Sequence, residues 1–363
     1  MFVVTNRNIE NEDGTDFGAV GDTCNTKGPA ELRLLEVTRK NGAWHVQVLR
    51  DKATDTMLAD LGVTKLSQPV YASQYAFKKI FNAAMANPVK PKHVVFFVHG
   101  FNNTVEDVVV RCDKIAKAFD VVVVAFSWPA NGGGIKGVAD YREDKRDAQA
   151  SVMAFDRVLE KARVLLHDLR ATAIEQIITE IEKTGKYSPK SERFRERLTA
   201  KAREHCPIQS TLMLHSMGNY LLERTLKSTA LGGNLPLFDN IVMCSADVNN
   251  PDHAEWVDRL QVRNRLYVTI NEDDSALKAA RLKGGEEQLA RLGHWTSNLT
   301  ARDAVYLDFT NAKHVGSSHA YFEGKALKNA KVKNFFAAAL QGRRAEQVVS
   351  IPYDSAKNLY RVS

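Results

Sequence analysis

An apolar run that stops at a serine and continues into a helical pattern restricts the fold of this chain more than any other feature. The run Leu212-Met213-Leu214-His215 is followed at once by Ser216, Met217 and Gly218. A short apolar segment that turns directly into a helix is typical of a buried strand, with the serine exposed on the turn. A serine hydroxyl is a poor nucleophile unless the backbone exposes it and a base takes its proton. Ser216 is therefore the candidate nucleophile.

The match to the usual Gly-x-Ser-x-Gly turn is partial. Leu214 stands at the first glycine position, whereas Gly218 is present at the second. Serine before glycine also occurs at the start of many ordinary helices, so this pattern alone leaves a catalytic serine and a plain helix start both open.

A second signal lies upstream of the serine. The apolar segment 93–98 predicts a buried strand and is followed by His99, Gly100 and Phe101. A His-Gly turn after such a strand resembles the loop that supplies one backbone N–H of an oxyanion hole, while the other comes from the residue after the nucleophile. The expected donors are the N–H groups of Phe101 and Met217. We expect the His99 imidazole itself to hold the loop rather than to react.

A third signal is the order of acid and base after the serine. The apolar segment 265–270 leads to Asp274, and His319 follows later. The order Ser, Asp, His is that of α/β hydrolases, whereas chymotrypsin and subtilisin have other orders.

Rival residues stay open at this stage. Asp247, which follows the apolar segment 239–245, is the alternative acid, and Asp273 is the neighbour of Asp274. His314 is a rival base, although its position after an apolar segment indicates a loop residue. His215 is expected to be structural, because it points away from the site if Ser216 points into it.

Apolar segments alternate with helical patterns along most of the chain. This alternation predicts an α/β fold with a mainly parallel sheet and helices on both faces. The functional residues should then gather where the strands end. Shorter alternating segments, 32–37 and 44–49, predict an antiparallel edge. The expected core strands are 93–98, 121–126, 209–214, 239–245, 265–270 and 303–309.

Together these segments resemble the bacterial α/β hydrolases of the esterase/lipase superfamily that are grouped under a domain of unknown function. The pieces that carry the resemblance are residues 3–7, 98–102, 126–129, 141–151, 215–219, 245–248, 274–277, 291–293 and 319–322. They span most of the chain in the same order.

The resemblance implies an α/β-hydrolase fold and a triad of Ser216, Asp274 and His319. The resemblance says little about which substrate is hydrolysed. We expect one domain over residues 1–363, with residues 1–90 forming the edge strands and lead-in. The charged, helix-prone segment 142–206 is expected to be a helical cap or lid, and an outward-facing helical hairpin is the alternative. Trp128 is either a pocket residue or a buried aromatic at the sheet.

Composition and charge narrow the possible partners, cofactors and location of the protein. The net charge is +7, but basic and acidic residues are interleaved and no nucleic-acid motif accompanies them. The chain therefore predicts no nucleic-acid partner, with attraction to a membrane surface left open. No metal-ligand or phosphate-binding pattern is present, so we expect no metal and no cofactor. Four scattered cysteines and the lack of an apolar leader or span predict a cytoplasmic protein; they are Cys24, Cys112, Cys206 and Cys244.

The resulting prediction is a serine hydrolase that cleaves a small-molecule carboxylic ester through an acyl-enzyme. Two alternatives are a lipase or phospholipase acting on membrane lipid, and a non-catalytic binding protein on a hydrolase scaffold. Acyl specificity, the alcohol and the oligomeric state do not follow from these residues.

Overall fold

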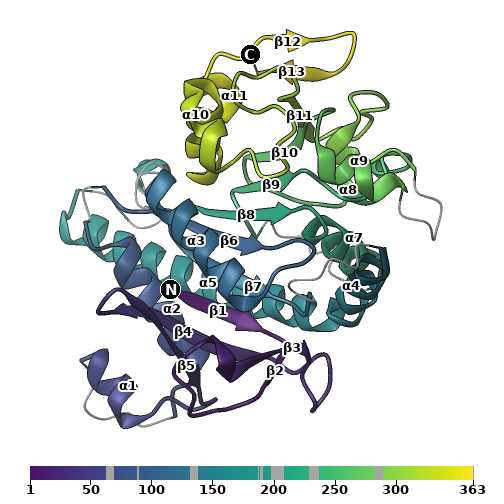
Figure 1. Ribbon diagram of the computed structural model, residues 1–363. Helices are drawn as coiled ribbons and strands as arrows, with labels where there is room; N and C mark the ends of the chain where they lie inside the picture. Colours follow the sequence, from purple (N-terminus) through teal and green to yellow (C-terminus); the bar gives the residue numbers. More distant parts are fainter. Residues whose placement is uncertain are drawn as a thin grey trace.

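A computed structural model describes residues 1–62, 69–87, 90–130, 138–186, 188, 191–197, 208–228, 237–282 and 289–362. Its centre is an eleven-stranded sheet with the order β12-β13-β11-β10-β9-β8-β6-β7-β1-β4-β5 (Figure 1). The chain belongs to the α/β class, as the alternation of segments predicts. The strands of this sheet are β1 Phe2–Thr5, β4 Arg33–Lys40, β5 Ala43–Leu49, β6 Val94–Val98, β7 Val122–Ser127, β8 Ser210–His215, β9 Asn240–Cys244, β10 Arg265–Ile270, β11 Ala304–Asp308, β12 Tyr353–Asp354 and β13 Leu359–Arg361.

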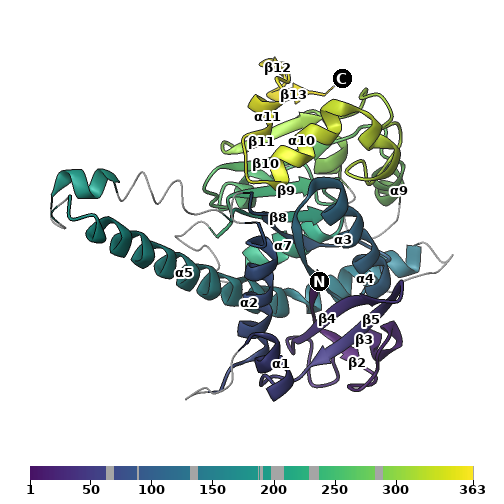
Figure 2. The ribbon, with the colours of Figure 1, turned by 90° about the vertical axis from the view of Figure 1, so that its left-hand side faces the viewer.

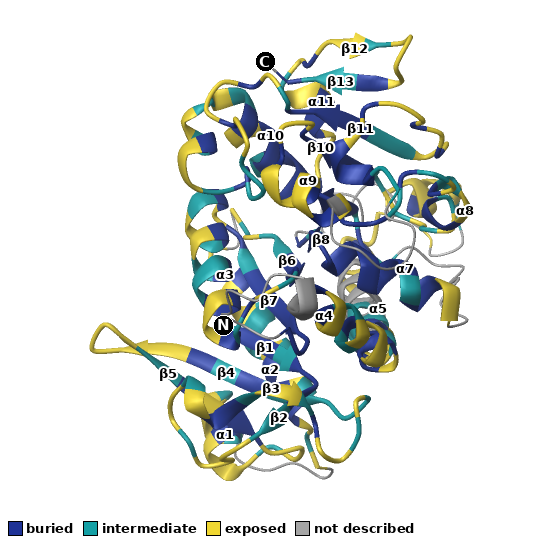
Figure 3. Cartoon of the chain, turned by 45° about the vertical axis from the view of Figure 1, so that its right-hand side comes forward, coloured by how far each residue is buried: buried dark blue, intermediate teal, exposed yellow. Residues whose placement is uncertain are grey.

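The six expected core strands all form, and they run parallel to one another from β6 to β11. Their apolar, β-branched composition suits strands that are buried on both faces. The expected antiparallel edge forms as well, as the β4–β5 hairpin. In Figure 3 the central strands are dark blue along their length, whereas the tip of this hairpin is exposed.

Alternate residues of each central strand enter two different cores. On β6, Phe96 belongs to one core, while Val95 and Phe97 belong to the other. The first core lies under α2, α5 and α7, and the second under α3 and α10. Helices therefore cover both faces of the sheet. The principal helices are α2 Ala72–Ala84, α3 Val105–Phe119, α4 Val138–Ala150, α5 Val152–Lys183, α7 Gly218–Ser228, α9 Ser275–Leu282 and α10 Ala330–Leu340.

Three strands of the sheet have no counterpart among the expected elements. β1 inserts between β7 and β4, and β12 and β13 extend the opposite edge beyond β11. Strands of two to four residues are too short for an apolar period to stand out. A separate two-stranded sheet is formed by β2 Arg7–Ile9 and β3 Val20–Cys24.

Helix α5 is the main described part of the segment 142–206 that was expected to form a cap. It starts near the carboxyl end of β7, where Phe155 stacks on Phe126. Farther along, Leu165 and Leu166 share a cavity wall with Val94 at the amino end of β6. The helix thus runs antiparallel to the strands and then extends beyond the body of the molecule (Figure 2).

This course leads α5 away from the strand ends at which the candidate site lies, so α5 does not cover that site as a lid. Residues 198–206 of the expected cap lie outside the described residues. Among the described helices, none is both long and apolar enough to cross a membrane.

Candidate active site

Ser216 sits on a sharp turn between β8 and α7. Its backbone φ is +53°, a left-handed value that is strained for a residue with a side chain. The turn is fastened to the next strand, because the Ser216 N–H donates to the Cys244 carbonyl at 3.0 Å. The Asn219 amide supports the same turn by donating to the Ser216 carbonyl at 3.0 Å. The strand-to-helix turn is the one that the sequence predicts, but Ser216 itself is buried, with 5% of its surface exposed.

The two glycine positions of the turn have different requirements. A Cβ on Gly218 would lie 2.8 Å from the His99 carbonyl oxygen and 2.9 Å from that of Val98. Only glycine lets the helix start approach β6 so closely. At the other position Leu214 is fully buried in the core under α5 and α7. A large side chain therefore fits there without disturbing the turn.

The loop after β6 lies against Ser216. A Cβ built on Gly100 would lie 2.7 Å from the Ser216 Cβ and 3.2 Å from its Oγ. The backbone of this loop is therefore adjacent to the serine. Of the expected oxyanion donors, Phe101 follows Gly100 and Met217 follows Ser216. Phe101 also lines the same cavity as Ser216.

His99 and Trp128 lock the base of this loop together. The Trp128 N–H donates to His99 Nε2 at 3.1 Å, and His99 Nδ1 lies 2.8 Å from the Gly100 carbonyl. The two rings stack with centroids 5.0 Å apart. Burial lowers the pKa of His99 to about 3, so the imidazole is neutral and carries its proton on Nδ1. His99 holds the loop, as expected.

Buried Arg7 holds the far end of the same loop. Its Nη2 donates to the Asn103 carbonyl at 2.6 Å, and its Nε donates to Ser127 Oγ at 3.0 Å. The Asn103 amide in turn donates to the Phe101 carbonyl at 2.6 Å. The first residue of β2 thereby positions the loop that presents the Phe101 N–H.

Asp274 and His319 form the acid–base pair. His319 Nδ1 lies 2.7 Å from Asp274 Oδ2, and Asp274 is fully buried. The other carboxylate oxygen accepts the N–H groups of Ala276 and Leu277, both at 3.0 Å, at the start of α9. These bonds fix the carboxylate at the start of α9. Because Nδ1 is paired with Asp274, Nε2 is the ring nitrogen of His319 that is available to exchange a proton.

The backbone of His319 is held from two sides. Its carbonyl accepts from Ser245 Oγ at 2.8 Å and lies 3.1 Å from His215 Nε2. The His215 and His319 rings are in contact, with centroids 4.7 Å apart. Burial, and then the neighbouring His319, hold the pKa of His215 well below its usual value. His215 is thus a neutral residue that positions His319, which agrees with the structural role expected for it. It lines the same cavity as Ser216, however, instead of pointing away from the site.

Asp247, the alternative acid, has other partners. It forms a buried ion pair with Arg291, with Oδ1 3.0 Å from Nε, and accepts from the Tyr141 hydroxyl at 2.9 Å. The Arg291 Nη1 also donates to Asn249 at 2.6 Å. Asp247 lines the catalytic cavity, but His319 pairs with Asp274 instead.

The remaining rivals do not line the cavity of Ser216. Asp273 and His314 have exposed side chains, and neither lines the cavity that contains Ser216. Trp128 is fully buried and donates its indole N–H to the His99 carbonyl at 3.1 Å. Trp128 packs beneath the loop and does not line the cavity of Ser216. Of the two roles expected for it, the structure therefore favours the buried aromatic at the sheet.

One cavity of about 640 Å³ brings these side chains together. Ser216, His215 and His319 share it, and within the described residues the Ser216 hydroxyl donates to no side chain or carbonyl. The hydroxyl is free to turn toward the imidazole when a substrate enters, since catalytic hydrogen bonds often tighten only then. The other lining residues are Phe101, Asn102, Asn103, Glu106, Asp107, Val110, Arg111, Lys114, Tyr141, Asp247, Ala276, Leu277, Ala279 and Ala280.

The roles of Arg7, Tyr141 and Arg291 were not predicted, although all three lie in segments that carry the family resemblance. A lone arginine after an apolar segment gives no sign of its distant partner. Among the described residues, no group of three His, Cys, Asp or Glu side chains is arranged to hold a metal ion.

A parallel sheet with a serine on a strained strand-to-helix turn, and with acid and base on later strand ends, defines the class of α/β hydrolases. A family model described as an alpha/beta hydrolase of unknown function (DUF900) matches residues 73–170 and 179–344. The chain belongs to this family. No match was found among the curated proteins or among the solved structures.

Proposed function

We propose that this protein is a serine hydrolase that cleaves carboxylic esters through an acyl-enzyme, with Ser216 as nucleophile, His319 as base and Asp274 as acid. The observation that carries the proposal is the 2.7 Å contact between buried Asp274 and Nδ1 of His319, a residue that lines the same cavity as Ser216. The strained backbone of Ser216 supports it independently.

In the first half of the reaction His319 Nε2 takes the proton of Ser216 Oγ as the oxygen attacks the ester carbonyl. Asp274 orients the imidazole and stabilises its cationic form. The N–H groups of Phe101 and Met217 bind the oxyanion that develops on the carbonyl oxygen. The imidazolium then gives its proton to the leaving alcohol, and the acyl group stays on Ser216.

In the second half a water molecule replaces the alcohol. His319 takes a proton from this water as it attacks the acyl-enzyme, and returns the proton to Ser216 Oγ when the ester bond breaks. A carboxylic acid leaves, and the enzyme returns to its starting state without a cofactor.

The lining of the cavity favours a small, polar ester over a long acyl chain. Charged and amide side chains from the loop after β6 and from α3 form one wall, among them Asn102, Glu106, Arg111 and Lys114. A long alkyl chain in this cavity would bury such groups without replacing their water, which is costly.

The test is hydrolysis of nitrophenyl esters from two to twelve carbons, together with labelling by a fluorophosphonate. We expect turnover of the short esters, and we expect Ser216→Ala to lower kcat by roughly 10⁴-fold or more and to abolish labelling. The thermal unfolding of the variant should match that of the wild type.

Ser275→Ala is a matched control, because Ser275 is an exposed serine beside Asp274 that does not line the cavity. Labelling of the wild type that persists in Ser216→Ala would refute the assignment. Absence of both turnover and labelling in folded wild type would favour a non-catalytic binding protein, and preference for the longest esters would favour a lipase.

A further inference from the structure

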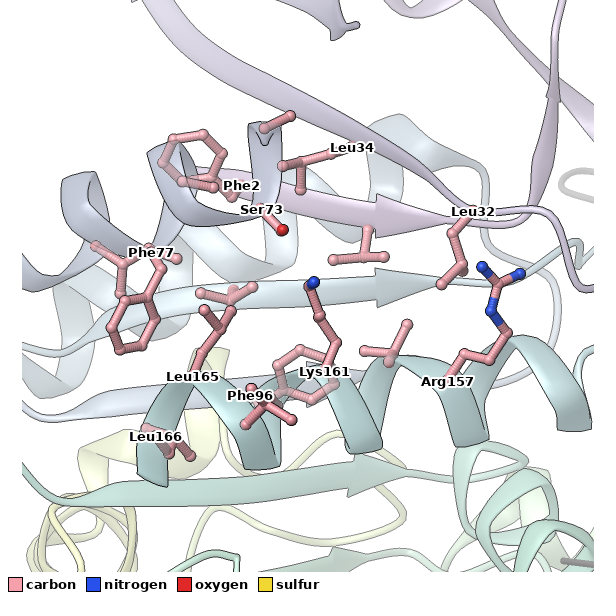
Figure 4. A pocket seen from close by; sticks show the side chains of 18 of the residues that line it. Phe2, Leu32, Leu34, Ser73, Phe77, Phe96, Arg157, Lys161, Leu165 and Leu166 are labelled. Atoms are coloured by element: carbon pink, nitrogen blue, oxygen red, sulfur yellow. The ribbon is translucent and has the colours of Figure 1, made fainter. Parts of the chain in front are cut away.

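A second and larger cavity lies on the face of the sheet that α2 and α5 cover. Its volume is about 780 Å³. Side chains from β1, β4, β6 and β7 form its floor, and α2 and α5 form its walls (Figure 4). Within the described residues, no side chain lines both this cavity and the catalytic one. A ligand bound here would therefore not share a wall with Ser216.

The lining of this cavity is mostly apolar. Phe2, Leu34 and Phe96 lie along the floor, and Phe77 and Leu165 face each other from the two helices (Figure 4). Aliphatic and aromatic walls around an unfilled space lose the dispersion contacts that a packed core would have. The volume falls in the range of small-molecule sites. An apolar ligand would restore these contacts.

Several polar side chains interrupt the apolar lining, among them Lys161 and Ser73. The Lys161 ammonium group and the Ser73 hydroxyl both point into the space between α5 and α2 (Figure 4). In the described part of the chain neither side chain has a hydrogen-bond or ion-pair partner. An ammonium group and a hydroxyl donor are the groups that bind a carboxylate.

The other cations of the lining are already engaged. Arg33 pairs with Glu31 at 2.6 Å, and Arg157 donates to the Ala30 carbonyl at 2.7 Å. Lys161 is therefore the lining cation that is left for a ligand among the described residues.

Carboxylates also line this cavity and limit what it accepts. Glu160 is paired with Arg163 at 2.6 Å, whereas Asp51 and Asp156 lie in the wall without a described ion pair. These two acids would repel a second negative group placed near them. The lining thus suits one anionic head beside Lys161 and one long apolar tail.

We propose that this cavity binds a single-chain amphiphile with an anionic head, of the class of medium- to long-chain fatty acids. The carboxylate lies between Lys161 and Ser73, and the alkyl chain extends between Phe77 and Leu165 over Phe96. Binding is non-covalent and does not depend on hydrolysis at Ser216.

The experiment is calorimetric titration of the Ser216→Ala protein with decanoate, dodecanoate and 1-decanol, each below its micelle concentration. We expect saturable one-to-one binding of both acids. Each buried methylene should tighten binding by about fourfold. The alcohol, which has the same tail but no charge, should bind more weakly than decanoate.

Two variants locate the ligand. Ala162→Trp fills the cavity from α5 and should weaken dodecanoate binding at least about tenfold, because the new ring takes the place of the alkyl chain. Met153→Trp is the matched control, since Met153 is an exposed residue of α5 that does not line the cavity. Lys161→Met should weaken decanoate about fivefold and leave 1-decanol unchanged.

No saturable binding would overturn the proposal, and so would binding that Ala162→Trp and Met153→Trp weaken equally. Equal affinities for decanoate and 1-decanol, unchanged in Lys161→Met, would exclude the anionic head. This last comparison decides the question even if Ala162→Trp does not fold. Because the protein used lacks the Ser216 hydroxyl, failure of the esterase assignment would leave these results intact.

Discussion

The catalytic cavity and the apolar cavity between α2 and α5 are built in opposite ways. At the catalytic cavity His319 is positioned by directional bonds, its ring by the Asp274 carboxylate and its backbone carbonyl by the Ser245 hydroxyl. The apolar cavity is defined by side chains that fail to meet across the space between two helices and the sheet. Directional bonds place reactive atoms, whereas non-directional apolar surface selects only for shape and chain length. The first kind of region suits chemistry and the second suits storage or sensing of an apolar ligand.

Substitution of Asp274 should give the largest difference between an effect on turnover and an effect on binding in the apolar cavity. Asp274→Asn leaves the shape of the side chain but places the imidazole in the wrong tautomer, so we expect kcat for a short ester to fall by roughly 10⁴-fold. Dodecanoate binding should not change. Steady-state kinetics and calorimetry on the same preparation measure both.

Asp247→Asn is the control for this prediction. It should reduce stability by about 3–5 kcal/mol, because it leaves the buried Arg291 without its counter-ion. Its kcat per folded molecule should stay within about tenfold of wild type. A larger fall in kcat for Asp247→Asn than for Asp274→Asn would exchange the roles of the two acids.

A smaller but still large effect is expected from Gly100→Ala. The new methyl group would lie 2.7 Å from the Ser216 Cβ, so the loop or the serine must move. Loss of one oxyanion donor typically costs about 10²–10³ in kcat. Gly18→Ala, at an exposed glycine where the Cβ would meet only the Asp16 carboxylate at 3.1 Å, should have no such effect. Wild-type kcat in Gly100→Ala would show that the loop does not contribute a donor.

The smallest of these effects concerns acid stability. The pKa of His99 is about 3 in the folded protein because of burial, and about 6.5 in an unfolded chain. Between about pH 6.5 and pH 3 the imidazole binds a proton in the unfolded state but not in the folded state. The free energy of unfolding therefore falls as the pH decreases through this range. From His99 alone this loss is roughly 2 kcal/mol at pH 5.

Urea unfolding at two pH values tests this prediction. The fall in the free energy of unfolding between about pH 7.5 and pH 5 should be smaller in His99→Gln than in wild type. Among the described residues no histidine lines the apolar cavity, whereas His215 contacts the catalytic base. Hydrogen exchange at low pH should therefore increase first around the catalytic loops. An equal pH dependence in wild type and His99→Gln would contradict the buried, neutral imidazole.

The sequence predicted the six core strands and the order of nucleophile, acid and base, because these depend on local pattern. An apolar run that ends at a functional residue is visible in a few consecutive positions, as at Ser216 and Asp274. The segment 142–206 illustrates the limit: its helical, charged pattern was visible, but the direction in which α5 runs depends on contacts such as Phe126–Phe155.

Local pattern by itself determined that this chain forms a mainly parallel sheet and that Ser216, Asp274 and His319 each follow one of its strands. Only the tertiary structure shows the partner of each acid, Arg291 for Asp247 and His319 for Asp274, since each acid follows an apolar segment and these partners are 44 and 45 residues away along the chain. It also decided that Trp128 supports the loop and that a cavity lies between α2 and α5. Ion pairs and cavities arise between segments that are distant in sequence, and no periodicity within one segment records them.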